Sequence, residues 1–285
     1  MMWKIGLTGW TDHPRVYHGP QRQQLEDYAA YFPVVEVDTS FYAIPRVSSV
    51  ERWVQRTPTT FEFIVKANRQ MTLHDVTDVE QLDESQQKEV FASFMEAFEP
   101  MTKANKLAFI LFQFPPYFTC SAKNIAYLKK IRAWLPVEVA IEFRHASWYD
   151  KLVQAEMFHF LEQQRYIHTI VDQPQVGEST VPYINRVTAS KAFIRLHGRN
   201  EAGWVQAKRT DGDGWREVRT LYRYSEAELV DIQKKSLEIK VPLYIVFNNN
   251  SGGDAADNGL SLQKISGLHY EGLANRQLNL FDEGE

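Results

Sequence analysis

The sequence predicts a single (β/α)8 barrel of the TIM type, with a long insertion after the seventh strand and a flexible C-terminal tail. Eight short runs of β-branched and aromatic residues have the length and apolar character of buried parallel strands. Most of them are separated by stretches with helical periodicity, and strands that alternate with helices form right-handed βαβ units. The 285 residues also fit one barrel of this type. The predicted strands are Lys4–Thr8, Val34–Asp38, Phe61–Ala67, Leu107–Phe112, Val137–Phe143, Tyr166–Val171, Ala192–His197 and Leu243–Phe247.

Helical periodicity is clearest in three of the intervening stretches. Gln86–Ala104 repeats apolar side chains every three or four residues, which predicts one amphipathic helix. Ser121–Leu135 begins with serine, a good N-cap, and Ser225–Ile239 begins with the capping-box pattern Ser-Glu-Ala-Glu. Gly9–Gln21 is long for a strand-to-helix connection, and Asp172–Ser190 shows little helical periodicity.

Composition excludes several classes of protein. The chain is 44% hydrophobic and carries 32 basic against 36 acidic residues, so it is not covered with positive charge for binding nucleic acid. A single cysteine, Cys120, excludes an internal disulfide and a cysteine-cluster metal site. No charged leader precedes a long apolar stretch, and the longest apolar run is far too short to span a membrane. We therefore expect a soluble cytoplasmic protein.

Charged residues lie within or at the ends of several apolar strands. They are Glu36, Lys66, Glu142, Arg144 and Arg195. In barrels of this type the active site forms where the carboxyl ends of the strands converge. Burying a charge is costly unless it is paired, so these residues should lie close together. A structural salt-bridge lattice is the alternative, but five such charges favour a polar ligand site.

The sequence nominates residues for catalysis and for ligand binding. Glu36 and Glu142 suit a general acid and base, with Lys66 or the arginines shifting their pKa values. The catalytic candidates are Glu36, Lys66, Glu142, Arg144 and His197. The ligand-binding candidates are Trp10, Asp38, Tyr42, Asn68, Gln113, His145, Trp148, Arg195, Arg199, Asn248 and Asn249.

An anionic group would suit the same end of the barrel. Arg144, Arg195 and Arg199, together with backbone amides of the turn Ser251–Gly253, have the chemistry of a phosphate site. A metal site would recruit His74, Glu142, Asp172 and His197. However, no two histidines have helical ligand spacing, and hard cations need several carboxylates at one point. No metal is assigned, and the cofactor is left open.

The insertion after the seventh strand spans 198–224. Between Arg195 and Tyr224 seven basic residues stand against four acidic ones, with Trp204, Trp215, Tyr222 and Tyr224 interleaved. Basic segments with aromatic residues can follow phosphates and stack on bases. A loop held against the barrel by its aromatic side chains is the alternative, and the small excess of positive charge favours it.

The segment 269–285, after a barrel of residues 1–268, is polar and is expected to be a tail. Within it Gln277, Leu278, Leu280 and Phe281 match the short peptide by which bacterial polymerases and repair proteins dock on the DNA sliding clamp. An apolar groove on a partner would bury these leucines and the phenylalanine. Alternatively, they fold back over the closed end of the barrel.

Six segments resemble the signatures of one bacterial family. They are Val35–Tyr42, Phe63–Asn68, Leu111–Pro116, Glu142–Trp148, Arg195–Arg199 and Phe247–Asn249. Together they are similar to the YecE-like family, domain of unknown function number 72, over roughly Ile5 to Leu262. Asp38 stands where the family has asparagine. The resemblance implies a barrel with an Arg- and Glu-lined mouth, broadly similar in fold to xylose-isomerase-like enzymes and abasic-site endonucleases. It does not imply a reaction.

Three functional hypotheses follow. The first is an enzyme acting on a phosphate-bearing substrate, including damaged or processed nucleic acid, and recruited to the sliding clamp by its tail. The second is a non-catalytic adaptor whose barrel binds a ligand. The third is a carbohydrate or sugar-phosphate enzyme of the xylose-isomerase type, in which the tail match is accidental.

Overall fold

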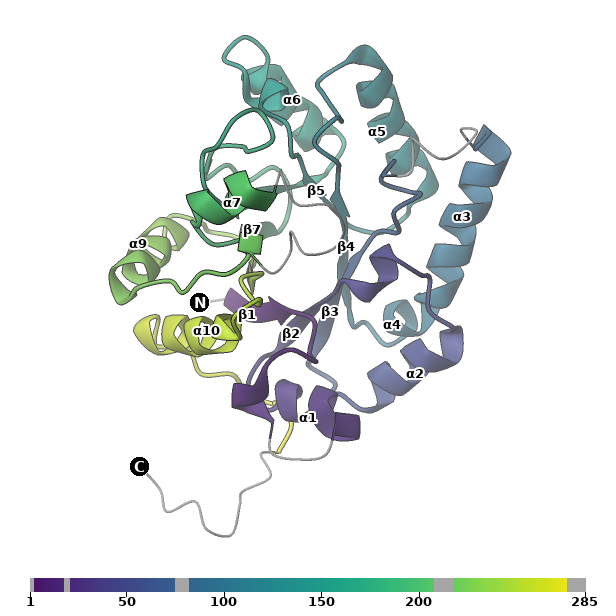
Figure 1. The fold of residues 1–285 in the computed structure, drawn as a ribbon. Helices are drawn as coiled ribbons and strands as arrows, with labels where there is room; N and C mark the ends of the chain where they lie inside the picture. Colours follow the sequence, from purple (N-terminus) through teal and green to yellow (C-terminus); the bar gives the residue numbers. More distant parts are fainter. Residues whose placement is uncertain (1–2, 18–20, 75–81, 208–217, 276–285) are drawn as a thin grey trace, which may run out of the picture.

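The computed structural model describes residues 3–17, 21–74, 82–207 and 218–275. Eight parallel strands form a closed barrel in chain order, and the last strand pairs with the first (Figure 1). This confirms the predicted (β/α)8 architecture. The strands are β1 (Trp3–Thr8), β2 (Val34–Val37), β3 (Glu62–Lys66), β4 (Leu107–Gln113), β5 (Val139–Glu142), β6 (Ile167–Asp172), β7 (Ala192–Leu196) and β8 (Leu243–Phe247).

Helices surround the barrel (Figure 1). They are α1 (Gln24–Ala29), α2 (Val47–Gln55), α3 (Glu84–Ala97), α4 (Glu99–Lys103), α5 (Ala122–Trp134), α6 (Gln154–Gln163), α7 (Glu201–Ala207), α9 (Glu226–Ser236) and α10 (Asp254–Ile265). Short 3-10 turns are η1 (Pro14–Val16), η2 (Gln21–Gln23), η3 (Thr39–Phe41) and η4 (Ala146–Tyr149). The expected N-caps are confirmed: Ser121 caps α5, and Ser225 forms a capping box with Glu228 on α9.

One predicted helical stretch is divided into two helices, although its apolar face is buried as expected. The periodic stretch Gln86–Ala104 is not a single helix, because α3 ends at Ala97 and α4 begins at Glu99. Pro100 occupies the first turn of α4. A proline lacks the N–H that would continue the hydrogen bonding of α3, and its ring clashes with the preceding turn, so the chain starts a new helix there. Apolar spacing alone carries no information about this break.

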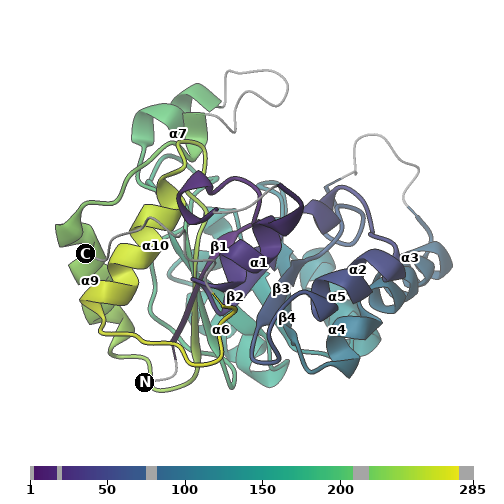
Figure 2. The same cartoon turned by 90° about the horizontal axis from the view of Figure 1, so that it is seen from below.

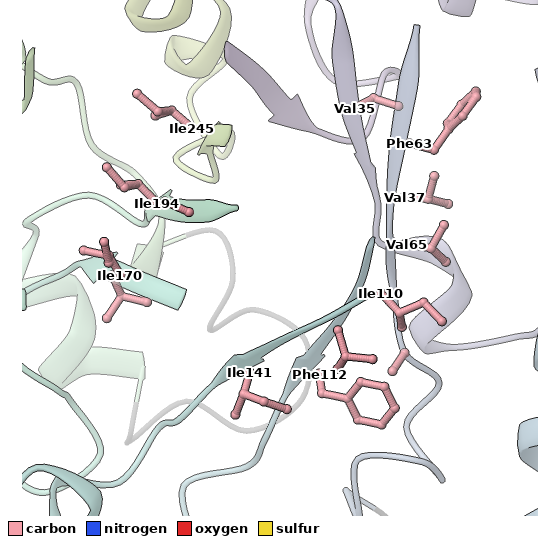
Figure 3. Packing of buried hydrophobic residues seen from close by; sticks show 14 of the residues in the cluster. Val35, Val37, Phe63, Val65, Ile110, Phe112, Ile141, Ile170, Ile194 and Ile245 are labelled. Carbon is pink, nitrogen blue, oxygen red and sulfur yellow. The ribbon is translucent and has the colours of Figure 1, made fainter. Parts of the chain in front are cut away.

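The core has two parts because side chains alternate across each strand. Outward-facing residues such as Val35, Val37, Phe63 and Val65 point away from the barrel axis (Figure 3). Inward-facing residues form a second cluster in the barrel interior. It consists of Val34, Ile64, Ala108, Phe109, Leu111, Ala140, Ile167, Phe193, Tyr244 and Val246.

The two ends of the barrel differ in what covers them. Helix α7 lies beyond the carboxyl ends of the strands (Figure 2), on the side where the candidate site was expected. At the opposite end, Tyr270 accepts a hydrogen bond from the Ile5 N–H at 3.0 Å, and the Ala274 N–H donates to the Ala29 carbonyl at 3.0 Å. The first part of the segment expected as a flexible tail is therefore bound to the barrel.

Two sequence predictions fall outside the described residues. The clamp-peptide residues are Gln277, Leu278, Leu280 and Phe281, and the insertion's Trp215 is also not described. Within the described residues, no helix combines the length and the apolar character needed to cross a membrane.

Candidate active site

The polar end of the barrel begins one inward-facing position beyond the apolar interior. Residues two apart on a strand share a face, so Glu36 follows Val34 into the barrel and Arg195 follows Phe193. Counting in the same way along the other strands places polar side chains at the corresponding inward-facing position of most of them. We call this set the mouth layer: Thr8, Glu36, Lys66, Gln113, Glu142, Thr169 and Arg195.

Arg195 is the centre of the mouth layer. Its Nε and Nη2 donate to the two carboxylate oxygens of Glu36 at 2.8 and 2.6 Å. Its Nη1 donates to Glu142 Oε2 at 2.6 Å and to Gln113 Oε1 at 3.0 Å. Both glutamates are fully buried, and Arg195 is 1% exposed. Bidentate, charge-assisted hydrogen bonds of this kind compensate the cost of burying all three charges.

Glu142 has a second oxygen that Arg195 does not use. Glu142 Oε1 lies 3.2 Å from His197 Nε2 and 3.1 Å from Arg144 Nη1. Neither contact has the angles of a hydrogen bond, so both Oε1 and Nε2 are buried without a hydrogen-bond partner among the described residues. The Asn248 amide donates to His197 Nδ1 at 2.9 Å. A neutral His197 ring therefore carries its proton on Nε2.

Burial and neighbouring charges set the protonation states of this group. Burial alone would raise the pKa of Glu142, but Arg195, His197 and Arg144 hold it well below its usual range. Burial lowers the pKa of His197 to about 3, with the two arginines adding to the effect and Glu142 opposing it. At neutral pH the pair is an ionised carboxylate beside a neutral imidazole. Burial raises the pKa of Glu36 against the effect of Arg195.

Lys66 differs from the other charged members of the mouth layer. Burial, followed by the positive charge of Arg195, lowers its pKa to about 8, although three nearby carboxylates oppose the shift. Its Nζ lies 4.6 Å from the centroid of the Phe41 ring. Within the part of the chain that the structure describes, this Nζ forms neither a hydrogen bond nor a salt bridge.

The three arginines expected at a phosphate group all have protein partners. Arg144 donates to Gln173 at 2.8 Å, and its guanidinium lies 5.2 Å from the Trp204 ring centroid. Arg199 is not part of the mouth layer network: it binds Asp172 at 2.7 Å and Glu228 at 3.2 Å. The Ser251–Gly253 turn leads into α10, whose first residue, Asp254, pairs with Arg223 at 2.8 Å.

Several predicted ligand-binding residues instead connect loops. The Asn68 amide donates to the Ser40 carbonyl at 3.1 Å, and the buried Asn249 amide donates to the Tyr222 carbonyl at 2.8 Å. His145 caps η4 by accepting the Ser147 N–H. These contacts hold the loops at the mouth in place.

The aromatic residues predicted to bind a ligand differ in how exposed they are. Trp148 is 1% exposed and stacks on Phe143 with a centroid distance of 4.0 Å, so it belongs to the core. Trp10 is half-buried and meets Trp53 edge-on at 5.2 Å. Tyr42, which is 46% exposed, is accessible to a ligand, as is the partly exposed Asp38.

The residues of the metal alternative do not form a metal site among the described residues. No three His, Cys, Asp or Glu residues among those described are close enough to hold a metal ion. His74 contacts the Thr72 hydroxyl at 2.8 Å instead.

In the insertion, Trp204 and Tyr224 are each 3% exposed. These two rings serve to hold the loop against the barrel, as the second interpretation of this segment expected.

Three polar residues of the site were not predicted. The hydroxyls of Thr8 and Thr169 are buried in the mouth layer and have no hydrogen-bond partner among the described residues. Gln173 accepts from Arg144. Counting in steps of two from the inward-facing Gly6 and Ile167 would have found both threonines. Gln173 follows the end of β6 and has no comparable signal.

The fold and these buried charges define a parallel (β/α)8 barrel protein with a polar mouth. The chain belongs to the family described as "Protein of unknown function DUF72", which matches residues 4–280. The UPF0759 protein YunF of Bacillus subtilis is 42% identical over 284 residues, which is 97% of this chain and 99% of YunF.

Crystal structures of two DUF72 family proteins share this fold. One from Enterococcus faecalis has a TM-score of 0.86 and 36% identity, with 98% of this chain and 100% of that chain covered. One from Thermotoga maritima has a TM-score of 0.77 and 32% identity, with 93% and 99% covered.

Proposed function

We propose that the protein is an enzyme that performs acid–base chemistry on a small anionic substrate of the sugar-phosphate class at the mouth layer. The observation that carries the proposal is the Glu142–His197 pair. An ionised carboxylate oxygen and a neutral imidazole nitrogen lie 3.2 Å apart, and both are buried without hydrogen bonds among the described residues. Buried polar atoms are rarely left unpaired in native proteins. A ligand that offers both a donor and an acceptor would satisfy them.

The two residues suit complementary roles. Glu142 is held ionised by neighbouring positive charge, so its Oε1 can accept a hydrogen bond from a substrate hydroxyl and take up its proton as that hydroxyl reacts. His197 is neutral, and its Nε2–H can donate to a substrate oxygen on which negative charge develops. Arg195 and Asn248 fix the orientation of the pair through the hydrogen bonds already described.

The charge of the site supports an anionic substrate. Lys66, Arg144 and Arg195 supply three positive charges, Glu36 and Glu142 supply two buried negative ones, and the more exposed Asp38 supplies a third. Asp38 is more exposed than either glutamate and lies outside the buried network. The Lys66 Nζ has no hydrogen-bond or ion-pair partner among the described residues, and an unpaired cation at the mouth favours a ligand of negative charge.

The test is thermal unfolding of the full-length protein with glucose 6-phosphate or ribose 5-phosphate, against the unphosphorylated sugars and inorganic phosphate. A ligand at a hundred times its Kd stabilises the native state by about 2.7 kcal/mol. We expect stabilisation by sugar phosphates that is lost in His197→Gln. Because His197 is neutral, this variant removes no charge from the network.

The matched control is Glu62→Gln at the other end of the barrel, which should keep the full effect. Stabilisation that is equal for every anion, or that survives in His197→Gln, would contradict the proposal. Compounds that stabilise the protein are then assayed for turnover.

A second proposal concerns the C-terminal peptide containing Gln277, Leu278, Leu280 and Phe281. We propose that it recruits the protein to the bacterial DNA sliding clamp, with nucleic acid as a further substrate class. The hydrogen bond from the Ala274 N–H to the Ala29 carbonyl supports this, because it holds the last described residues at the end of the barrel opposite the mouth. Loss of clamp binding in a Leu280→Ala/Phe281→Ala variant is the expected result. No binding by the intact protein would remove this proposal.

A further inference from the structure

Lys66 occupies an unusual position for a lysine. It is the last residue of β3, and it follows the inward-facing Ile64 by two positions, so its side chain belongs to the barrel interior. The side chain is half-buried beside Arg195 and packs over the Phe41 ring. Among the described residues, no carboxylate comes within salt-bridge distance of its Nζ. The Phe41 ring and three nearby carboxylates stabilise the ammonium form less than burial and Arg195 destabilise it, and the pKa of Lys66 is lowered.

The buried Lys106 shows what a structural role looks like in the same molecule. Lys106 is 4% exposed. Its Nζ donates to the Val54 carbonyl at 2.7 Å, to the Thr57 carbonyl at 2.7 Å and to the Thr57 hydroxyl at 3.0 Å. All three protons of this ammonium are used, whereas the Lys66 ammonium donates to no group among the described residues. Lys66 is therefore half-buried at the mouth, with no hydrogen-bond or ion-pair partner for its Nζ among the described residues.

We infer that Lys66 is an amine nucleophile that forms a Schiff base with the carbonyl group of an aldehyde- or ketone-bearing sugar phosphate. The inference rests on the proposed function, because it specifies which group of that substrate reacts and which residue reacts with it. A lysine is activated for such attack when it is desolvated or when another cation lies beside it. Both conditions apply to Lys66, because burial and the neighbouring Arg195 cation each lower its pKa.

The step balances without a co-reactant. Overall, the Lys66 ammonium and a carbonyl group give an iminium ion and one water molecule, with one positive charge on each side. The neutral amine attacks the carbonyl carbon, a C–N bond forms and the oxygen takes a proton. The C–O bond then breaks, and that oxygen leaves as water.

The Glu142–His197 pair provides the proton transfers that this step needs. The His197 Nε2–H can donate to the carbonyl oxygen during attack, and Glu142 Oε1 can accept the proton that the amine loses. Glu142 is close enough to Lys66 to affect its charge state. The iminium ion keeps the positive charge of Lys66, so the electrostatic balance with Glu36 and Glu142 is unchanged.

The experiment traps the Schiff base. The full-length protein is incubated at pH 7 with glycolaldehyde phosphate or dihydroxyacetone phosphate and sodium cyanoborohydride, and the adduct is located by peptide mass spectrometry. An amine with the lowered pKa of Lys66 has a neutral fraction about three hundredfold larger than that of an exposed lysine at this pH. We expect a single dominant adduct on Lys66, with Lys106 unmodified in the same digest.

Two controls make the result decisive. Lys66→Met, checked for folding by thermal unfolding, should lose the dominant adduct, and glycolaldehyde without phosphate should give less of it. Adducts spread over surface lysines and unchanged in Lys66→Met would overturn the inference. No adduct from either phosphate, with sugar-phosphate stabilisation still dependent on His197, would overturn the role of Lys66 alone and leave the proposed function standing.

Discussion

The two ends of the barrel use their charges differently. At the amino end, Lys4 pairs with Glu62 at 2.8 Å, and Tyr244 donates to the same carboxylate at 2.7 Å. Lys191 likewise pairs with Glu138. These ion-paired side chains are between 22% and 40% exposed.

At the mouth, Arg195 and both of its glutamates are at most 1% exposed. The network there still leaves Glu142 Oε1, His197 Nε2 and the Lys66 amine without hydrogen bonds among the described residues. The charges at the amino end therefore have partners within the protein. Incomplete pairing at the mouth supports the proposed ligand site over a salt-bridge lattice.

The largest expected difference between the ends is the cost of removing a cation. Arg195→Met leaves two buried carboxylates without their main partner, and breaking such a network costs roughly 3–5 kcal/mol. Lys191→Met breaks a partly exposed pair, which is worth about 0–1 kcal/mol. Urea unfolding of both variants measures this. Equal losses in unfolding free energy would show that the mouth network contributes no more than a surface ion pair.

Lys106 and Lys66 allow a second comparison, between a lysine with a full set of hydrogen bonds and one with none among the described residues. Lys106→Met leaves the carbonyls of Val54 and Thr57 without a donor, and an unsatisfied buried group costs about 1–3 kcal/mol. Lys66→Met removes a poorly stabilised charge and breaks no hydrogen bond, so we expect an unchanged or increased free energy of unfolding. A Lys66→Met variant that loses as much stability as Lys106→Met would contradict a functional role for Lys66.

The pH dependence of stability reports on the same lysine. The pKa of Lys66 is about 8 in the folded protein and near 10.5 in the unfolded chain. Between these values the unfolded chain binds more protons, so the contribution of Lys66 to the unfolding free energy increases as pH rises. Subtracting the Lys66→Met curve from the wild-type curve isolates this contribution. A flat difference between pH 8 and 10 would exclude the lowered pKa.

The smallest effects come from single hydroxyl groups. Tyr244→Phe at the amino end loses the hydrogen bond to Glu62, which is worth about 0.5–1.5 kcal/mol. Thr169→Val at the mouth replaces a buried hydroxyl that has no partner among the described residues, so stability should not fall. Ligand-induced stabilisation should decrease only in Thr169→Val. A decrease of ligand-induced stabilisation in Tyr244→Phe and not in Thr169→Val would place the ligand site at the amino end of the barrel and contradict the proposed site at the mouth.

Much of this arrangement could be predicted from the sequence, because strand periodicity is a local property. Runs such as Leu243–Phe247 identify strands, and the two-residue repeat brings Glu36 and Arg195 to the inward face. The choice of partners depends on geometry that sequence does not supply. Arg199 was grouped with Arg195, yet it pairs with Asp172 because β6 and β7 are neighbours in the barrel.

The most direct measurement is the protonation of Lys66 itself. Competitive labelling of the full-length protein with acetic anhydride across a pH series, followed by mass spectrometry, gives the pKa and reactivity of individual lysines. The account predicts that Lys66 titrates near 8 and is protected by a stabilising sugar phosphate, while exposed lysines titrate near 10.5. A Lys66 that titrates with the exposed lysines and is not protected would contradict the central claim.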